Sequence, residues 1–257
     1  MIRSVERVLD ILLLFSNKKP RWSLTEISKQ TEIPKTTVFN LVKTLEVKGF
    51  IRQDKETLKY TLGHKLFTLG STMIETFEIN QKAIVPSHYL AESTGLNCKV
   101  GIWDDDAVIV TVDIGLAHTG FLSKRLGPRL VAYCSALGRS ILAYISSDRL
   151  HSYLDQTELV SLTPNTIVDR EQLLHQLQLT RHLGYSINKE EINLGASSIG
   201  APVFAGDQEV VASICLDGPT DVILGEKMNT YIEALKSAAA EISLSMGWRR
   251  VLPGEVD

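Results

Sequence analysis

The chain has 257 residues, of which 44% are hydrophobic and 22% are charged, a composition that excludes wholesale disorder. No apolar run approaches the roughly 18 residues of a membrane span, and the first residues lack the pattern of a secretion signal. The three cysteines, Cys98, Cys134 and Cys215, lie far apart, which excludes a disulfide framework and a cysteine-rich zinc site and suits a reducing compartment. We therefore expect a cytoplasmic protein with no membrane anchor, no bound metal and no cofactor.

The net charge of −3 is divided unevenly along the chain. Residues 1–62 hold 12 Lys and Arg against 7 Asp and Glu, a net charge of +5, whereas residues 63–257 hold 15 against 23, a net charge of −8. A small basic head on a larger acidic body indicates that only the head meets a polyanion such as nucleic acid. An excess of this size also arises by chance, so the motifs must decide between the two interpretations.

Three helices are predicted along the head. The first has Ser4 as its N-cap and ends before Pro20, because proline cannot continue a helix. The second starts at a capping box, Ser23-Leu24-Thr25-Glu26, whose hydroxyl and carboxylate each satisfy a free N–H group. The third has Pro34 at its first helical position, where the missing N–H costs nothing, and closes at Gly49 in a left-handed conformation.

Two short strands, 50–52 and 58–62, follow with a polar tip between them. Three helices and a two-stranded hairpin, in this order, are typical of a winged helix-turn-helix, whose recognition helix enters the major groove of DNA. Because a fold does not fix a function, the alternative that this module makes protein–protein contacts stays open.

The third helix separates an apolar face from a polar one. The apolar residues have the spacing i, i+3, i+4, i+7 and are Val38, Leu41, Val42 and Leu45. The opposite face is short, polar and basic, and its residues are Thr36, Asn40 and Lys43, flanked by Thr37 and Thr44. Asn40 is the expected base reader, because its amide can pair with N6 and N7 of adenine. The residues expected to hold backbone phosphates are Lys35, Arg52, Lys55 and Lys59. The alternative is a polar face that is merely solvated.

The body begins with two predicted helices. The first continues past the hairpin with an apolar stripe, which needs a partner unless it packs on the head; its residues are Leu66, Leu69, Met73 and Phe77. The second covers 79–93 with an interruption at Pro86. The elements after it are strands at 98–103 and 107–114, a turn at Gly127-Pro128, helices at 138–146, 149–154 and 171–182, a hairpin of 203–204 and 210–216, and a helix at 227–246. Strands in hairpin pairs with helices between them predict an α+β fold with a mostly antiparallel sheet.

Several motifs follow one another along nearly the whole chain in the order of one known family. They are Ser4-Val5-Glu6-Arg7, Pro34-Lys35-Thr36-Thr37-Val38, Leu45-x-x-x-Gly49-Phe50, Ala136-Leu137-Gly138-Arg139, Thr163-x-x-Thr166-x-x-Asp169 and Glu191-x-x-x-Gly195-x-x-Ser198. In these motifs the chain resembles the IclR family of bacterial transcriptional regulators. Members of that family often carry Arg at the position of Asn40, and this departure leaves the operator sequence open.

The resemblance implies three parts: a winged helix-turn-helix DNA-binding domain at 1–63, a linker helix at 64–78 that contributes to dimer contacts, and a GAF-like domain at 79–257 that binds a small effector and oligomerises. It implies a homodimer, with a homotetramer favoured, on a palindromic operator of double-stranded DNA. The effector implied is an organic acid or an aromatic or sugar-derived catabolite. Repression and activation both stay open.

The resemblance also implies that four segments of the body converge on the effector. Free N–H groups at a helix start can hold an anion, and the residues there are Ser135, Ala136, Leu137 and Gly138. The other expected contacts are Asn188, Ser198, Cys215 and Asp217. The Asp217 charge would repel a carboxylate without screening, so we expect hydroxyl or amino donors of the effector to face it. Alternatively, Cys215 and Ser198 are plain core and Asp217 faces solvent.

Catalysis is not predicted, because the sequence has no His-Glu-x-x-His, no Gly-x-Ser-x-Gly and no phosphate-binding loop. One alternative is a thiol enzyme in which Cys134, at a helix start, has a lowered pKa. Another is a DNA-bound oligomerisation protein without a ligand, which a body domain filled by side chains would favour. We expect a DNA-binding regulator controlled by an effector rather than either of these.

Overall fold

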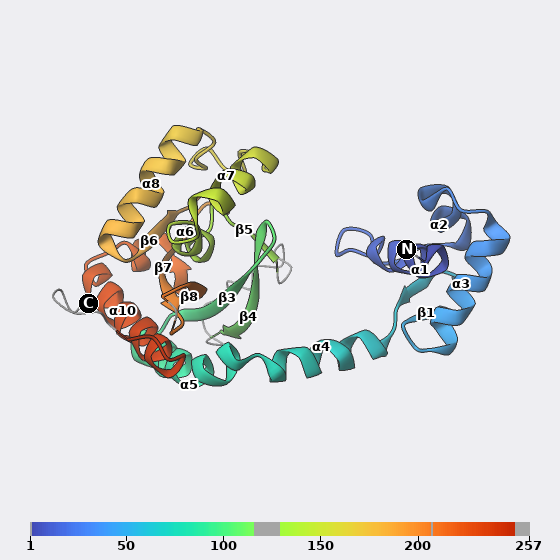
Figure 1. Ribbon diagram of the computed structural model, residues 1–257, viewed down its shortest axis with the longest axis horizontal. Helices are drawn as coiled ribbons and strands as arrows, with labels where there is room; N and C mark the ends of the chain where they lie inside the picture. The colour runs from blue at the N-terminus through green and yellow to red at the C-terminus, as the bar shows by residue number, and fades with distance from the viewer. Residues whose placement is uncertain (1, 116–128, 207, 250–257) are drawn as a thin grey trace. The chain divides into compact units, whose positions relative to one another are not determined.

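The computed structural model describes residues 2–115, 129–206 and 208–249, and the chain divides into two compact units, Met1–Thr76 and Phe77–Asp257. Figure 1 traces the elements of both units. The predicted turn at Gly127-Pro128 lies outside the described residues. In the part of the chain that the structure describes, no helix is both long and apolar enough to cross a membrane.

The first unit is a bundle of short helices with a two-stranded wing. Its elements are α1 (Arg3–Leu13), α2 (Leu24–Thr31), α3 (Lys35–Val47), β1 (Ile51–Gln53), β2 (Tyr60–Leu62) and α4 (His64–Thr76). The strands β1 and β2 pair antiparallel. The wing is reinforced by Trp22, whose backbone N–H and C=O pair with Tyr60 at 3.1 and 2.7 Å. Residues from all three helices and from β1 form one buried core, so the head packs as a unit.

Two local signals in the head fold as predicted. In the capping box, the Glu26 N–H donates to Ser23 Oγ at 3.3 Å and the Ser23 N–H donates to Glu26 Oε2 at 2.8 Å. The hydrogen bond from the Ser23 N–H is the main reason that the pKa of Glu26 falls to about 2. Gly49 has φ +77° after the end of α3, which is the left-handed cap that the sequence predicts.

Two predicted helix starts are wrong by one or two residues. The N-cap of α1 is Ile2 rather than Ser4, and its side chain caps nothing, because at this exposed end water can satisfy the free N–H groups. Pro34 has an extended ψ of 135°, so it is the N-cap of α3 and not its first helical residue. The fixed φ of proline suits both positions, so the sequence alone could not separate them.

The second unit is built on one antiparallel sheet in the order β5-β4-β3-β8-β7-β6. Its strands are β3 (Asn97–Asp104), β4 (Ala107–Ile114), β5 (Arg129–Val131), β6 (Ser186–Lys189), β7 (Ala196–Phe204) and β8 (Val210–Pro219). Its helices are α5 (Glu78–Thr94), α6 (Ala136–Leu142), α7 (Ser147–Gln156), α8 (Arg170–Leu183), α9 (Thr220–Ile223) and α10 (Met228–Ser245). The predicted α+β class with a mostly antiparallel sheet is confirmed.

Helices cover both faces of this sheet, with a separate apolar core on each side. The long helices α5 and α10 pack on one face, and α6 packs on the other with α8 behind it (Figure 1). Helix α6 lies very close to the sheet, since a Cβ at Gly200 would come within 2.6 Å of the Ala136 carbonyl oxygen. The hydroxyl of Ser186 donates to that carbonyl at 2.7 Å, and Ser213 donates to the Leu137 carbonyl at 2.9 Å. The start of α6 is therefore fixed to the strands beneath it.

Several short elements were not predicted from the sequence, namely β5, β6, α9 and the first half of β7. The segment Ala196–Pro202 is rich in small residues and contains a proline, which is unfavourable in a central strand. The structure tolerates Pro202 because β6 pairs only with Ser197–Gly200, and beyond Gly200 the strand β7 has a neighbour on one side only. Helix α6 also begins two residues before the predicted start at Gly138.

Candidate functional site

The polar half of α3 is exposed as the sequence predicts. Val38, Val42 and Leu45 are buried against the head core. The side chains expected at DNA bases and phosphates stand on the other half; Lys35, Thr36, Asn40, Lys43 and Thr44 are exposed, and Thr37 is half-buried. The hydroxyl of Thr44 donates to the Asn40 carbonyl at 2.9 Å, and Lys43 Nζ lies 3.1 Å from Glu46 Oε2. Among the described residues of this surface, the exposed side chains of Lys35, Thr36 and Asn40 make no such contact.

Sequence reasoning missed one exposed side chain on the same half of α3. Phe39 has 51% of its surface exposed, which is unusual for a phenylalanine beside a packed core. At 100° per residue it lies nearer to Thr36 and Lys43 than to the buried stripe. Its place on the helix beside Lys43 was the available signal, because an apolar ring on the half expected to face DNA can contact a thymine methyl group.

The wing presents its basic residues to solvent. Arg52, Lys55 and Lys59 are all exposed, and Arg52 Nη1 lies 3.4 Å from His64 Nε2. The tip between the strands is held by Asp54, whose Oδ1 accepts the N–H groups of Glu56 and Thr57 at 3.1 and 2.8 Å. These hydrogen bonds and one from the Thr57 hydroxyl lower the pKa of Asp54. The wing is thus a defined turn that carries cations.

A pocket opens on the α6 face of the second unit. The empty space in it and in its open mouth together is about 640 Å³. It lies where the start of α6 meets the ends of β6, β7, β8 and β3. The residues that line it are Lys99, Leu130, Ser135, Ala136, Leu137, Asn188, Ile192, Asn193, Ala196, Ser197, Ser198, Cys215, Asp217 and Gly218.

The sheet register explains why distant residues meet in this pocket. Asn188 on β6 pairs with Ser198 on β7, and Ser198 pairs with Asp217 on β8. Two residues along β8 from Asp217, Cys215 pairs with Lys99 on β3. Because alternate residues of a strand share a face, these side chains form two adjacent rows across four strands.

Seven of the eight residues expected at the effector line the pocket; these are Ser135, Ala136, Leu137, Asn188, Ser198, Cys215 and Asp217. Gly138 does not line it. Its N–H donates to Ser135 Oγ at 3.0 Å, and a Cβ there would lie 2.3 Å from the Ala132 backbone, so the residue serves close packing behind α6. The hydroxyl of Ser135 is correspondingly engaged as the N-cap of α6.

The most important lining residue that the sequence did not indicate is Lys99. Its Nζ lies 2.7 Å from Asp217 Oδ1, and Asn97 Nδ2 donates to the other carboxylate oxygen at 3.4 Å. Burial works against the Lys99 charge, but the negative groups around it, Asp217 first among them, together raise the pKa of Lys99. Asp217 is therefore not the isolated charge expected from the sequence, because Lys99 is in direct contact with its carboxylate. The alternation of strand residues places Lys99 on one face, but only the register with β8 brings it to Asp217.

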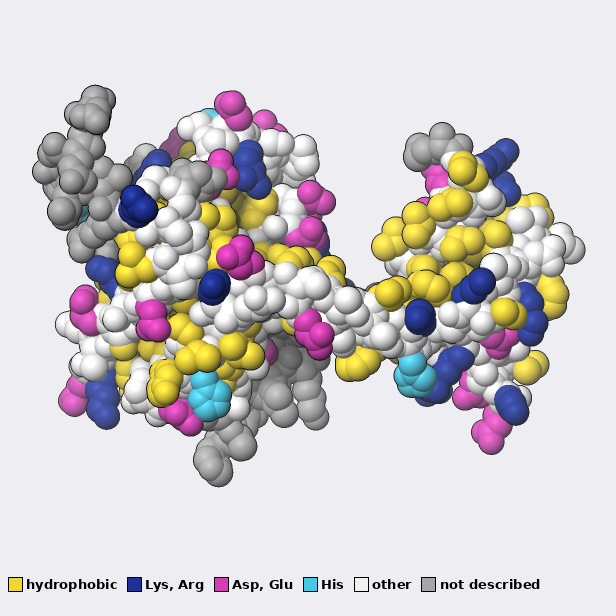
Figure 2. All heavy atoms as spheres, turned by 60° about the horizontal axis from the view of Figure 1, so that its bottom comes forward, with side chains coloured by type: hydrophobic (Ala, Val, Ile, Leu, Met, Phe, Trp, Pro, Cys, Tyr) yellow, Lys and Arg dark blue, Asp and Glu magenta, His cyan; other side chains and the backbone are white. Residues whose placement is uncertain are grey.

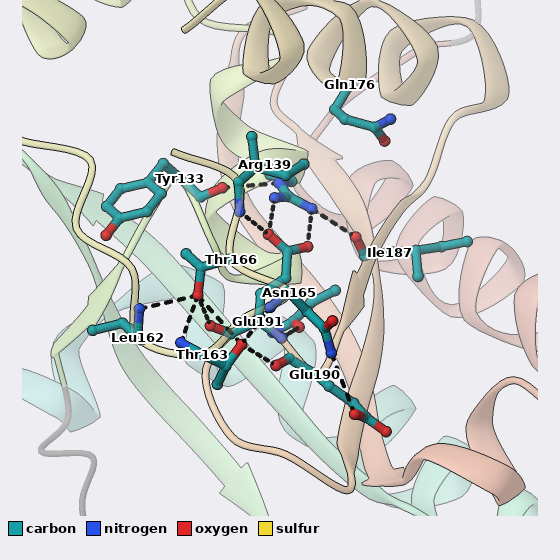
Figure 3. A network of polar contacts seen from close by, with 12 residues as sticks. Tyr133, Arg139, Leu162, Thr163, Asn165, Thr166, Gln176, Ile187, Glu190 and Glu191 are labelled. Carbon is teal, nitrogen blue, oxygen red and sulfur yellow. Dashed lines mark hydrogen bonds and ion pairs between the residues drawn. The ribbon is translucent and has the colours of Figure 1, made fainter. Parts of the chain in front are cut away.

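A buried ion pair supports the pocket from behind (Figure 3). Arg139 of α6 and Glu191, which follows β6, have only 2% and 5% of their side-chain surface exposed. Arg139 Nη1 donates to Glu191 Oε1 at 2.5 Å, and Arg139 Nη2 donates to Oε2. The guanidinium also donates to the carbonyls of Tyr133 and Ile187 at 2.8 and 2.9 Å. It therefore joins three segments of the unit.

The same network reaches the pocket wall through Asn188. Its Oδ1 accepts the Glu191 N–H at 2.9 Å while the side chain lines the pocket. The loop before α8 is attached as well, since Thr166 Oγ1 donates to the Glu191 carbonyl at 2.6 Å and Thr163 Oγ1 donates to the Glu190 carbonyl at 2.7 Å. The position of Asn188 in the pocket is thus fixed by a buried, fully paired set of polar groups.

Cys134 does not have the environment of a nucleophile. Its thiol is buried, and burial raises the pKa to about 12, with the Glu191 charge adding to the effect. The expectation of a lowered pKa in the thiol-enzyme alternative is therefore wrong. Within the described ranges no group of three or more His, Cys, Asp or Glu is placed to hold a metal ion.

The winged head and the pocket-bearing α+β unit together define a helix-turn-helix transcriptional regulator, and comparisons with known proteins agree. Residues 4–55 match the family model described as the IclR helix-turn-helix domain, and residues 71–244 match the model described as the bacterial transcriptional regulator IclR C-terminal domain. The chain belongs to the IclR family of bacterial transcriptional regulators.

Three individual relatives illustrate the similarity. The chain is 31% identical to the HTH-type transcriptional regulator XynR of Escherichia coli K12 over 250 residues, which cover 96% of this chain and 98% of XynR. The crystal structure of the Thermotoga maritima IclR has a TM-score of 0.75 at 27% identity and covers 96% of this chain and 100% of that one. An IclR homologue from Microbacterium hydrocarbonoxydans, complexed with 4-hydroxybenzoate, has a TM-score of 0.80 at 19% identity over 95% and 98% of the two chains.

Proposed function

We propose that the polar half of α3 binds duplex DNA in a sequence-specific way. The observation that carries this proposal is the exposed set of small hydroxyls, one amide and lysines on that half, with no acid before Glu46. Asn40 reads a base, and Thr36, Thr37, Lys43 and Thr44 contact base edges or phosphates near it. Lys35 and the wing cations Arg52, Lys55 and Lys59 hold the phosphate backbone.

Fluorescence anisotropy with the full chain tests this proposal. The probe is a labelled duplex from the region upstream of the gene, titrated at several salt concentrations. Specific binding should weaken steeply with salt, because each neutralised phosphate releases a counterion. Lys35→Ala should reduce the salt slope, whereas the matched control Lys82→Ala, an exposed lysine of the second unit, should not. A flat salt response of the wild-type chain would overturn the proposal.

We also propose that the pocket of the second unit binds a small effector that controls DNA binding. Its hydroxyl, amide and charged lining and the hydrogen-bonded network behind it suit an organic acid or an aromatic or sugar-derived catabolite. The Microbacterium homologue shows that this fold holds 4-hydroxybenzoate in one protein. The open pocket speaks against the alternative of an oligomerisation protein without a ligand. Screening such acids by thermal shift, followed by DNA release, tests the assignment.

A homodimer, able to pair further into a homotetramer on a palindromic operator, is part of the proposal. Hydrophobic side chains lie exposed on the surface of the first unit (Figure 2). On α1 they are Ile2, Val5, Leu9 and Leu13, each at least half exposed, and on α4 they are Phe67, Leu69, Met73 and Ile74. Apolar faces of this extent need a cover in water. Size-exclusion chromatography with light scattering measures the state, and Leu9→Lys should shift it toward monomer.

As a regulator of bacterial genes the protein acts in the cytoplasm, where the DNA lies, and it works by binding rather than by catalysis. The effector changes transcription only if its affinity differs between two arrangements of the protein, because equal affinities shift no equilibrium. Whether the effector releases or recruits DNA is read directly from the sign of its effect on operator affinity.

A further inference from the structure

The pocket wall carries one positive and one negative charge among its described lining residues, Lys99 and Asp217. Their side chains are 20% and 24% exposed, so the pair is largely removed from water yet faces the pocket. At 2.7 Å the two groups are in direct contact. A pair in this intermediate environment interacts more strongly than a surface pair, because water screens it less.

A second carboxylate adds to the negative side of this pair. Asp113 on β4 is the cross-strand partner of Lys99, so the lysine stands between the strands that carry Asp113 and Asp217. Burial raises the pKa of Asp113, the Lys99 charge lowers it and the Asp217 charge raises it again, so the three groups interact electrostatically. Lys99 is therefore in direct contact with Asp217 and is also subject to the charge of Asp113 across β3, although Asp113 itself does not line the pocket.

This arrangement treats a carboxylate and a hydroxyl on a ligand differently. A ligand carboxylate next to Asp217 would compete with it for a single lysine, and it could bind only by displacing Asp217 or by meeting its repulsion. A ligand hydroxyl can donate to the Asp217 carboxylate while Lys99 keeps its contact. Elsewhere the described lining is uncharged and offers hydroxyl and amide groups of Ser135, Asn188 and Ser198. One ligand carboxylate there meets no negative charge that would repel it.

We infer that the Lys99–Asp217 pair determines the charge of the effector: the pocket takes molecules with a hydroxyl directed at Asp217 and at most one carboxylate, and it excludes dianions. The inference rests on the proposed effector-binding function of this pocket. It makes Asp217 a specificity-determining residue that acts by its charge, and Lys99 the residue that holds that carboxylate in place.

Three matched ligand pairs isolate this effect, since in each pair a terminal hydroxyl is replaced by a carboxylate. The pairs are 4-hydroxybenzoate and terephthalate, 4-hydroxybutyrate and succinate, and gluconate and glucarate. Affinities are measured by isothermal titration with the full chain and with Asp217→Asn, Lys99→Met and the charge-exchanged double variant Lys99→Asp/Asp217→Lys. The double variant keeps a pair of opposite charges on the two strands and controls for folding, which circular dichroism monitors in all variants.

The wild-type chain should bind the hydroxy acid of at least one pair at least about tenfold more tightly than its dianion, the discrimination expected of a partly buried charge. Asp217→Asn leaves Lys99 without its close partner, so the preference should fall or reverse in favour of the dianion. Lys99→Met should weaken the binding of every anionic ligand. The double variant should remain folded but prefer the hydroxy acids less strongly than the wild type does.

The outcomes separate the inference from the proposed function. If wild type and Asp217→Asn bind the same ligands with the same hydroxy acid to dianion ratio, the pocket is an effector site but the charge rule is wrong. If wild type prefers a dianion, the charge rule is likewise wrong. If neither protein binds any of the six ligands, including the dianions that an unpaired Lys99 would attract, the proposed effector function of the pocket fails together with the inference.

Discussion

The buried pair of Arg139 and Glu191 allows the sharpest test of how the second unit is held together. Replacing Glu191 with Leu removes a carboxylate that is 5% exposed and leaves the guanidinium of Arg139, 2% exposed, without its charge partner. The remaining hydrogen bonds to two carbonyls do not neutralise that charge. Breaking a buried ion pair from one side costs about 3–5 kcal/mol. Arg139→Met should cost a similar amount, because it strands Glu191 in the same way.

Hydrogen exchange in the full chain measures this cost. The amides of β3 and β8 lie in the middle of the sheet, so they exchange only when the unit unfolds. A loss of about 3–5 kcal/mol accelerates their exchange between about a hundredfold and several thousandfold, since 1.4 kcal/mol is a factor of ten. As a matched control, Asp155→Ala breaks the exposed pair with Arg170, 65% and 46% exposed, and should change exchange less than about fivefold.

The double variant Arg139→Met/Glu191→Leu completes the cycle. Apolar side chains of similar size in place of both charges remove the stranded ion, so the double variant should be more stable than either single variant. If Glu191→Leu accelerates exchange of the β3 and β8 amides less than tenfold, or if the costs of the two single variants simply add, the buried pair does not act as we describe.

Three further predictions concern the head. Asn40→Ala should lower discrimination between operator and mutated operator by about 1–3 kcal/mol. Lys43→Ala should instead weaken binding to all duplexes alike and reduce the salt slope, and competition binding in a salt series measures both effects. Phe39→Ala should lower the affinity for a selected operator. Replacing one contacted thymine with uracil should lower the affinity of the wild type but not that of the variant, and equal losses of affinity in both would refute a methyl contact. Glu26 has a folded pKa lowered to about 2, so its contribution to stability is complete above the unfolded pKa of about 4.3 and is lost as the pH falls toward 2. Exchange of α2 amides, corrected for intrinsic rates, should reveal this loss in the wild type, and Glu26→Gln should flatten it.

The head could be predicted from the sequence almost element by element, because its signals are local. The capping box of Ser23, the glycine at position 49 and the helical spacing of Val38, Val42 and Leu45 each act within a few residues. The exposed face of α3 follows directly from that spacing. The starts of α1 and α3 were misplaced only where a neighbouring position suits the same residue type.

The pocket depends on contacts that no local pattern records. Lys99 and Asp217 meet because β3 pairs with β8, strands that lie more than a hundred residues apart in the chain. Arg139 and Glu191 are separated by 52 residues and are joined by packing of α6 on the sheet. Seven expected lining residues came from the resemblance to a family and not from periodicity. The network that holds these residues, and the position of Lys99 beside Asp217, could not be predicted from the sequence, because they depend on contacts that form only in the folded chain.

The close approach of α6 to the sheet at Gly200 has a consequence for the evolution of ligand choice. With no side chain there, the helix start sits directly on β7, and the distance between these two walls limits how thick a bound molecule can be. A methyl group at position 200 would have to lift the first turn of α6, along with Ala136 and Leu137, and so widen the gap. A substitution at this one position would therefore change the width of the pocket without altering the polar side chains of Asn188, Ser198 and Asp217 that line it.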